Sequence, residues 1–286
     1  FLLMSGMLLL ALALCRERTV WAVIAGLMLG LSALTRATTE YLPLFMLAFF
    51  YWVVGRRLFV RVVLPAAVVA LSVIAAWKLR NLAAIGALSD PALMVSAVHH
   101  GIYPEFLFNG IPETRGIPYR FDPFTSRISG AYSILTELVR RASDEPLHYL
   151  WWFLIGKQVS LLSWNMIDGV GDIFIYPITA SPYFDRSLFT ATRMVALWLH
   201  APLSIAAVAG CGIVLIRPGW LGLAEATRMP AQLVAMLVLY FFAIHFVGAP
   251  YPRYGIPLRP LIYGFGLFTL ISLARNIIPG WRGSKQ

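Results

Sequence analysis

An apolar run over residues 58–76 constrains this 286-residue chain more than any other feature of its sequence. A helix of about 20 residues rises about 30 Å, which matches the hydrocarbon core of a bilayer. The run is followed directly by Trp77-Lys78-Leu79-Arg80-Asn81. Because indole rings and long cationic side chains are favourable at the membrane interface, we expect a membrane-spanning helix to end at this stretch.

The composition supports a membrane protein. Hydrophobic residues make up 59% of the chain and charged residues 13%, against about 25% charged in soluble domains. A net charge of +10 would suggest a nucleic-acid partner for a soluble chain, but here the cations flank apolar segments and no nucleic acid is expected. Cys15 and Cys211 lie in or beside apolar segments, which favours small buried side chains over a disulfide framework.

Six other apolar stretches are also predicted to form helices. The first, residues 1–14, is too short to cross a bilayer and is followed by no cleavage-site pattern. We therefore expect a fragment that begins partway through a helix and lacks upstream sequence. Two arms of about 15 residues and three longer spans follow, at residues 20–34, 41–54, 188–216, 231–247 and 256–273.

The polar residues 35–40 separate the two short arms. Helices of about 15 residues reach only roughly 22 Å, so this apex should lie below the outer surface and line a cavity. Arg36 and Glu40 are then expected either to form a structural ion pair at the apex or to serve a site there.

Loop charges predict the orientation. Ten Lys and Arg residues fall in the turns at 16–19, 55–61 and 217–228 and in the tail, whereas the opposite short loops hold three. The first side is therefore predicted to be cytoplasmic. The chain then divides into transmembrane helices over 1–77, an extracytoplasmic loop over 78–187, further transmembrane helices over 188–274 and a cytoplasmic tail over 275–286. The predicted fold class is an all-α polytopic membrane bundle.

Two helices are expected in the long loop. Apolar residues recur at helical spacing over 128–142, with charged residues opposite, which predicts an amphipathic helix on the membrane or on its neighbours. Residues 147–164 could cross a bilayer, but polar residues interrupt them and tryptophans recur, so we interpret them as an interfacial helix. Lys157 is expected to snorkel rather than to contact phosphate. Prolines and glycines keep the earlier part of the loop irregular.

The sequence offers few motifs for chemistry. It has no glycine-rich phosphate loop, no zinc-type spacing and no nucleophile elbow. His99 and His100 are adjacent, so they point apart on a helix, and a solvated pair is the more ordinary reading than a metal site. We therefore predict no cofactor and no metal ligands, and leave a divalent-metal requirement open.

Cations at the outer ends of helices are the main candidates for binding. Arg80 can hold a phosphate with two hydrogen bonds and the adjacent Asn81 amide can share it, although anchoring to lipid headgroups is the commoner role. Three prolines stiffen the stretch around Arg253 and Tyr254. The alternative interpretation of this stretch is an ordinary tight turn between helices. With Arg36, these residues form a predicted binding set for a lipid-linked phosphate.

Four stretches resemble motifs of the GT-C superfamily of membrane glycosyltransferases, in the branch of protein O-mannosyltransferases and the lipid A aminoarabinose transferase. Residues 26–36 (GLMLGLSALTR) resemble that family's GLLLGLAxLTR helix end. Residues 77–86 are similar to its WxxRNxxxxG exit into the outer loop. Residues 145–164 resemble its HPxxYL…K…W interfacial helix, and residues 252–260 (PRYGIPLRP) its PRYxxPxxP helix start.

The resemblance implies an inverting transferase on the extracytoplasmic face, expected in a bacterial inner membrane. A polyprenyl-phosphate-linked sugar would be the donor, and a lipid, glycan or protein the acceptor. The family's acidic catalytic residue belongs to a first outer loop that has no counterpart in this chain, so no catalytic residue is named and Glu40, Asp90 and Glu105 are not promoted to that role.

Two other functions are alternatives to a transferase. A transporter or lipid-linked-sugar flippase would also need apolar helices and a cationic mouth, but it should show similar halves or matched broken helices. The halves of this sequence differ, and a long amphipathic outer loop suits a conduit poorly. A non-catalytic membrane scaffold would need neither the Arg-Asn pair nor the Pro-Arg-Tyr stretch.

Overall fold

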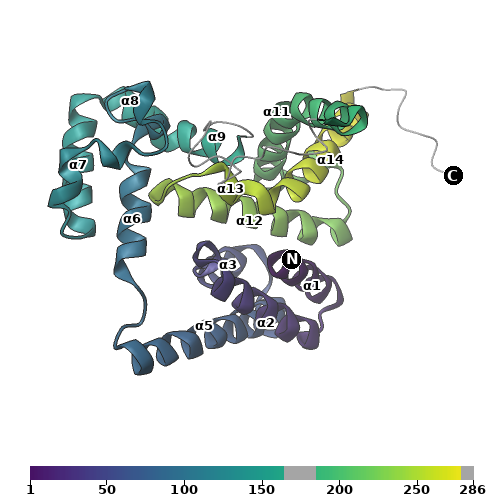
Figure 1. The fold of residues 1–286 in the computed structure, drawn as a ribbon. Helices are drawn as coiled ribbons and strands as arrows, with labels where there is room; N and C mark the ends of the chain where they lie inside the picture. Colours follow the sequence, from purple (N-terminus) through teal and green to yellow (C-terminus); the bar gives the residue numbers. More distant parts are fainter. Residues whose placement is uncertain (164–184, 278–286) are drawn as a thin grey trace. The chain divides into compact units, whose positions relative to one another are not determined.

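The structure is a computed structural model that describes residues 1–163 and 185–277 (Figure 1). Over these residues the chain is helical, and its only extended pairing is an isolated bridge between Phe108 and Ile111. The predicted all-α architecture is confirmed for this part of the chain. Trp164 and most of the predicted tail lie outside the described residues.

In the part of the chain that the structure describes, four helices are long and apolar enough to cross a membrane, as the sequence predicted for a membrane protein. They are Arg56–Ile85, Ser187–Ile216, Thr227–Val247 and Pro252–Arg275. In the labels of Figure 1 these spans fall on α5 (Leu64–Ile85), α11 (Ser187–Ile216), α12 (Glu225–Val247) and α14 (Arg259–Ile277). Two shorter apolar helices precede them, α1 (Leu2–Arg16) and α2 (Thr19–Thr35).

The chain forms two compact units that are each built from separate stretches of sequence. The first unit comprises Phe1–Ser89, Ile205–Phe241 and Pro260–Gln286. The second comprises Asp90–Ser204 and Phe242–Arg259. Each unit therefore depends on contacts between residues that are far apart in the chain.

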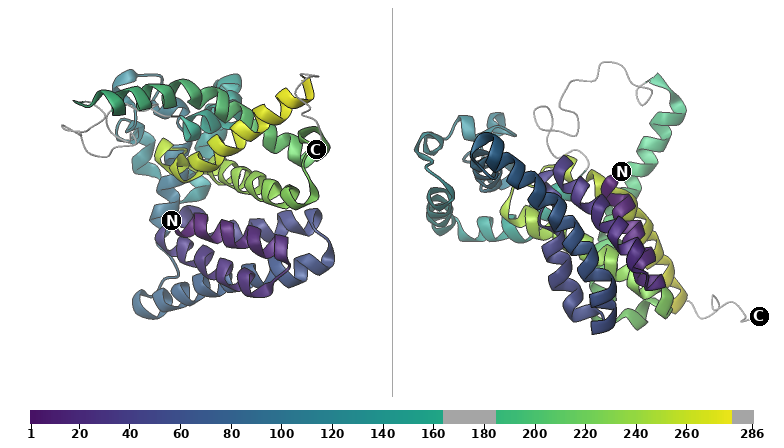
Figure 2. Two further views of the ribbon diagram at one scale, coloured as in Figure 1. Left: turned by 90° about the vertical axis from the view of Figure 1, so that its right-hand side faces the viewer. Right: turned by 90° about the horizontal axis from the view of Figure 1, so that it is seen from below.

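Close helix packing defines the N-terminal part of the first unit. Helices α1, α2 and α5 lie side by side in both views of Figure 2. Gly26 and Gly30 lie four residues apart on α2, and a Cβ at Gly26 would come within 2.3 Å of the Ala66 carbonyl oxygen on α5. Small residues at this spacing let two backbones approach closely, as in membrane helix pairs.

The helix that contains Trp77 does not end there. It continues to Ile85 and ends at Gly86, whose φ of 73° is the left-handed conformation typical of a glycine after a helix. Residues 77–85 contain neither proline nor glycine, so nothing local stops the helix at the expected point. Our predicted end at residues 77–81 is wrong by more than one turn.

At the polar apex, Glu40 makes an ion pair that the sequence did not indicate. Its carboxylate lies 2.6 Å from Lys78 Nζ on α5, and the side chains are 24% and 29% exposed. Arg36, the partner expected from the sequence, lies at the end of α2 in extended conformation, and its backbone carbonyl accepts a hydrogen bond from Thr39 Oγ1. Lys78 reaches the apex because α5 continues past the bilayer-length run.

The second unit begins with α6 (Pro91–Gly101), a helix that was not predicted, capped by the Asp90 side chain. Irregular chain with short 3₁₀ turns follows, as expected from its prolines. Helix α7 (Ala131–Asp144) matches the predicted amphipathic helix, starting three residues later. The predicted helix at 147–164 is observed as α8 (Pro146–Trp151), a π-helical turn at Trp152–Gly156, and α9 (Lys157–Leu162).

Among the described residues of the second unit, two apolar clusters contribute to its core. One contains Ile102, Tyr103 and Ile134 and joins the end of α6 to α7. The other joins distant stretches of the chain, because Phe106 and Trp152 pack with Ala249 and Tyr251. The second cluster ties the segment after α12 to the rest of the unit.

Candidate functional site

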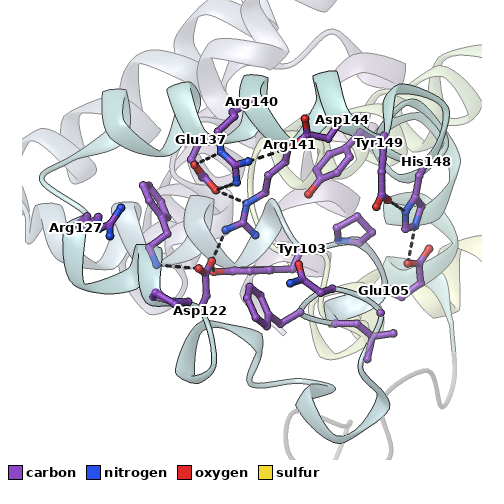
Figure 3. A pocket seen from close by; sticks show the side chains of 18 residues that line it. Tyr103, Glu105, Asp122, Arg127, Glu137, Arg140, Arg141, Asp144, His148 and Tyr149 are labelled. Carbon is purple, nitrogen blue, oxygen red and sulfur yellow. Dashed lines mark hydrogen bonds and ion pairs between the residues drawn. The ribbon is translucent and has the colours of Figure 1, made fainter.

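A polar cavity of about 610 Å³ lies within the second unit (Figure 3). Its walls come from the irregular chain after α6, the turn that begins at Asp122, helix α7 and the start of α8. Charged side chains dominate the lining, with five carboxylates, three guanidinium groups and one imidazole. The lining is Tyr103, Pro104, Glu105, Leu107, Phe108, Asn109, Gly110, Asp122, Pro123, Phe124, Arg127, Glu137, Arg140, Arg141, Asp144, Glu145, His148 and Tyr149.

Asp122 is the centre of a buried hydrogen-bonded network on the cavity floor. One carboxylate oxygen accepts from the Phe124 backbone N–H at 2.9 Å. The other accepts from Tyr103 Oη at 2.5 Å and pairs with Arg141. Because the single Tyr103 hydroxyl proton goes to Asp122, the His99 ring donates through Nε2–H to Tyr103 Oη, 2.7 Å away. We call Tyr103, Asp122, Glu137 and Arg141 the floor network.

The charges of the floor network are fixed by their neighbours. Burial alone would raise the pKa of Asp122, but hydrogen bonds from Tyr103 and Arg141 outweigh it and lower that pKa. Hydrogen bonds from Arg140, then Arg141, lower the pKa of Glu137 to about 2. Burial and the hydrogen bond to Asp122 raise the pKa of Tyr103. At neutral pH the floor is thus a set of ionised carboxylates paired with arginines.

Helix α7 places these groups by its periodicity. Glu137 is three and four residues before Arg140 and Arg141, so all three lie on one face. Glu137 accepts from Arg140 at 2.6 Å and from Arg141 Nε at 2.7 Å. The Arg141 guanidinium also lies over the Tyr103 ring, 5.1 Å from its centroid. The resulting network has little freedom to rearrange.

His148 bridges two carboxylates at the edge of the cavity (Figure 3). Its Nδ1 lies 2.9 Å from Glu145 Oε2 and its Nε2 lies 3.0 Å from Glu105 Oε2. Hydrogen bonding to Glu145, followed by that to Glu105, raises the pKa of His148. Glu145 belongs to the end of α7, whereas Glu105 is 43 residues before His148, so the imidazole joins two walls.

The wall that carries Glu105 has an unusual backbone. Glu105, Phe106 and Asn109 have φ values of 50°, 58° and 52°, a left-handed conformation that non-glycine residues rarely adopt. Phe106 is buried and stacks on the Tyr251 ring at 4.7 Å. Packing and the His148 bridge together hold this strained wall in place, an arrangement that recurs where ligands bind.

The residues predicted from sequence lie elsewhere. Arg80 donates to the Asn81 side chain at 3.1 Å and lies over the Trp77 ring, on the exposed end of α5 in the first unit. Arg36 belongs to the first unit as well. None of the five predicted residues is among the described residues that line the cavity.

Arg253 and Tyr254 lie together in the second unit, in a short helix α13 (Pro252–Gly255). The Arg253 guanidinium lies over two aromatic rings, 4.8 Å from Tyr251 and 5.4 Å from Tyr254. Tyr254 in turn contacts the His245 ring at 5.4 Å. The structure therefore pairs Arg253 with Tyr254 and Arg80 with Asn81, in different units.

Lys157 does not snorkel. Its side chain is fully buried, and Nζ donates to the carbonyl oxygens of Phe246 at 2.7 Å and Gly248 at 3.2 Å. It also lies 4.0 Å from the Phe153 ring centroid, and burial lowers its pKa to about 7. The π-helical turn just before Lys157 shifts the helix register, and the unpaired carbonyls at the end of α12 supply acceptors.

The adjacent histidines occupy different environments, as their helical spacing implies. His99 is hydrogen-bonded to Tyr103 of the floor network, whereas His100 packs on the Tyr119 ring with 4.4 Å between ring centroids. Burial, then the nearby charges of His99 and Arg253, lowers the pKa of His100 to about 4. Among the residues that the structure describes, no three His, Cys, Asp or Glu side chains are grouped to hold a metal ion.

Comparisons with known proteins do not extend this picture. No family model matches the sequence, and no curated protein or solved structure matches it.

Sequence reasoning missed the cavity. One local signal was available, because Asp122 before Pro123 is a typical side-chain cap of a turn. Asp122 and Arg141, which form an ion pair, are 19 residues apart in the sequence, and no sequence periodicity indicates that they pair.

Proposed function

We propose that this chain is part of a membrane glycosyltransferase that transfers a sugar from a polyprenyl-phosphate carrier to an acceptor on the extracytoplasmic face. The observation that carries the proposal is a charged cavity in a compact unit, in a chain whose described part also has four helices long and apolar enough to cross a membrane. A transferase for a lipid-borne substrate needs both environments. The resemblance of four sequence stretches to the GT-C superfamily supports the same function.

The proposed reaction breaks the bond between the sugar C1 and a phosphate oxygen of the carrier. A bond then forms between C1 and the acceptor hydroxyl oxygen, whose proton passes to a general base. The departing lipid phosphate needs cationic stabilisation. The proposed contacts are Arg253 and Tyr254 in the second unit and Arg36, Arg80 and Asn81 in the first unit, each set taken by itself. No residue is assigned as the base.

The geometry of Arg253 suits the proposed role. Its guanidinium lies against the rings of Tyr251 and Tyr254, and proline residues flank the short helix that carries it. Stacking restricts the side chain, and a guanidinium group can hold phosphate oxygens with paired hydrogen bonds. A positioned guanidinium loses less conformational entropy on binding than a mobile one.

Exposed apolar side chains support placing the second unit at the membrane surface. Tyr132 on α7 is 83% exposed and Leu147 on α8 is 80% exposed. Leu135 and Val139 are also exposed and lie on the same face of α7 as Tyr132. Trp151 and Leu154 are exposed on the same face as Leu147. We propose that both helices lie in the headgroup region, on the extracytoplasmic side that the loop charges predict.

A transfer assay tests the proposal. The full-length protein would be reconstituted in vesicles with a polyprenyl-phosphate-linked radiolabelled sugar, and transfer to membrane acceptors would be measured. Arg80→Ala and Arg253→Ala should each abolish transfer with expression intact, and Arg57→Ala, which removes an exposed cation in a turn of the first unit, should not. Unchanged transfer in both variants would exclude them from the site, and movement of the labelled lipid across the bilayer without transfer would favour a flippase.

A further inference from the structure

The cavity of the second unit combines a rigid floor with an accessible edge. The Asp122 and Arg141 side chains on the floor are 3% and 11% exposed, and each already has protein partners. At the edge, Glu105 and His148 are 37% and 43% exposed. Asn109 also lines the cavity, and Arg127 lines it on the side opposite Glu105 (Figure 3). A ligand would therefore meet the edge groups, while the floor network keeps the shape of the cavity.

The chemistry of the edge favours hydroxyl groups as partners. Glu105 uses one carboxylate oxygen for His148 and has a second oxygen that can accept from a hydroxyl. The Asn109 amide can both donate and accept, and the Arg127 guanidinium donates. A ligand with several hydroxyls around a ring needs such a mixture, because each hydroxyl donates one hydrogen bond and can accept others.

Three other ligand classes fit the cavity less well. An apolar ligand would have to remove water from five carboxylates and three guanidinium groups, which is costly. An anion would meet more carboxylates than guanidinium groups. Because arginines already pair with Glu137, Asp122 and Asp144, a polyamine would have to displace existing ion pairs or use the edge alone.

Aromatic side chains complete the lining. Phe108, Phe124 and Tyr149 line the cavity beside the charged groups. Sugar rings present hydroxyls at their edges and C–H groups on their faces, so they use both kinds of wall. The volume of about 610 Å³ falls within the range of small-molecule sites, roughly 300–1,000 Å³.

We propose that this cavity binds a neutral carbohydrate, with Glu105, Asn109 and Arg127 contacting its hydroxyl groups. This saccharide site is separate from the cations proposed for the donor phosphate, none of which is among the described residues that line it. Binding here does not depend on the transferase assignment. It would stand if the protein transferred no sugar at all.

The test measures binding of small probes to the full chain in detergent by ligand-observed NMR. The probes are methyl α-mannopyranoside and maltose as neutral sugars, glucuronate as an anionic sugar, and spermidine as a polyamine. We expect the neutral sugars to bind in the millimolar range and the other two to bind more weakly. Absence of neutral-sugar binding, or tighter binding of glucuronate or spermidine, would overturn the proposal.

Matched variants locate the binding. Asn109→Gly removes the amide and suits the left-handed backbone, and Arg127→Ala removes the guanidinium. Each should weaken neutral-sugar binding about tenfold, the effect of one good hydrogen bond. Arg115→Ala and Glu113→Gln remove exposed charges of the same unit that do not line the cavity, and should leave binding unchanged. Equal weakening in edge and control variants would refute this location.

Discussion

Lys157 Nζ donates to the carbonyl oxygen of Phe246 at 2.7 Å, across 89 residues of sequence. The same α8–α9 region adds a bond from Ser160 Oγ to the Pro250 carbonyl and one from Trp152 Nε1 to the Gly101 carbonyl. The bonds from Lys157 and Ser160 hold the stretch that leads into Arg253 and Tyr254, and the Trp152 bond holds the end of α6. A lysine that anchors backbone carbonyls in this way is a structural clamp rather than a surface cation.

Replacing Lys157 with Met should destabilise the second unit. The substitution keeps the apolar stem and leaves the carbonyls of Phe246 and Gly248 without the amine, at a cost of about 1–3 kcal/mol for a buried group left unsatisfied. Thermal unfolding in detergent should show a lower midpoint. Ile155→Met on the exposed side of the same helical region should change the midpoint little, and equal midpoints for the two variants would contradict the clamp.

Adding a methyl group at Gly26 should disrupt the pairing of α2 with α5. A Cβ there would lie 2.3 Å from the Ala66 carbonyl oxygen, so the two backbones must separate. Gly26→Ala should cost about 1–3 kcal/mol through overpacking. Gly264→Ala is the control, because nothing lies within 4 Å of its Cβ position and alanine is the better helix former. If both variants unfold alike, the close packing does not exist.

The floor network should be sensitive to the charge of Asp122. Asp122→Asn deprives the buried Arg141 of one of its two carboxylate partners, and we expect a loss of about 2–4 kcal/mol. Asp144→Asn removes an exposed partner of Arg140, with side chains 66% and 61% exposed, so its effect should stay below about 1 kcal/mol. Chemical unfolding of both variants provides the comparison. A larger loss for Asp144→Asn would show that the network is not buried.

The His148 bridge should make the cavity wall sensitive to pH. The pKa of His148 is raised above its ordinary 6.5 by hydrogen bonds to Glu145 and Glu105. The stability that the His148 bridge contributes to the cavity wall is therefore complete below about pH 6.5, and it is lost as the pH rises through the pKa of His148 in the folded state. Hydrogen exchange of residues 104–110, corrected for the intrinsic dependence of exchange on pH, should show less protection above that point. His148→Gln should remove the pH dependence, and a slope that survives in this variant would assign the effect to another group.

The sequence predicted the helices well because apolar runs of bilayer length have few alternatives. Local patterns failed at the ends of helices and at polar contacts. Interfacial residues at Trp77 and Arg80 suggested a helix end, yet only the glycine at position 86 stops the helix. Lys157 looked like a surface lysine because its two carbonyl acceptors lie far along the chain.

The cavity could not be predicted for the same physical reason. Asp122, Arg141 and Glu105 carry no spacing that marks a common site, and the three meet only after the irregular chain folds against α7. The polar face of α7 was recognised, but no partner was predicted for its charges. In the structure Glu137 and Arg141 are 12% and 11% exposed, so half of that face is interior.

The second unit takes Phe242–Arg259 from a stretch far downstream of its other residues. During translation, residues 90–163 leave the ribosome long before the carbonyls of Phe246 and Gly248 exist. Until the downstream stretch is synthesised, the Lys157 amine and the Trp152 indole lack their final neighbours. The second unit therefore cannot be completed before residues 242–259 are synthesised, and a ribosome stalled before residue 242 would present an unfinished unit to the quality-control machinery.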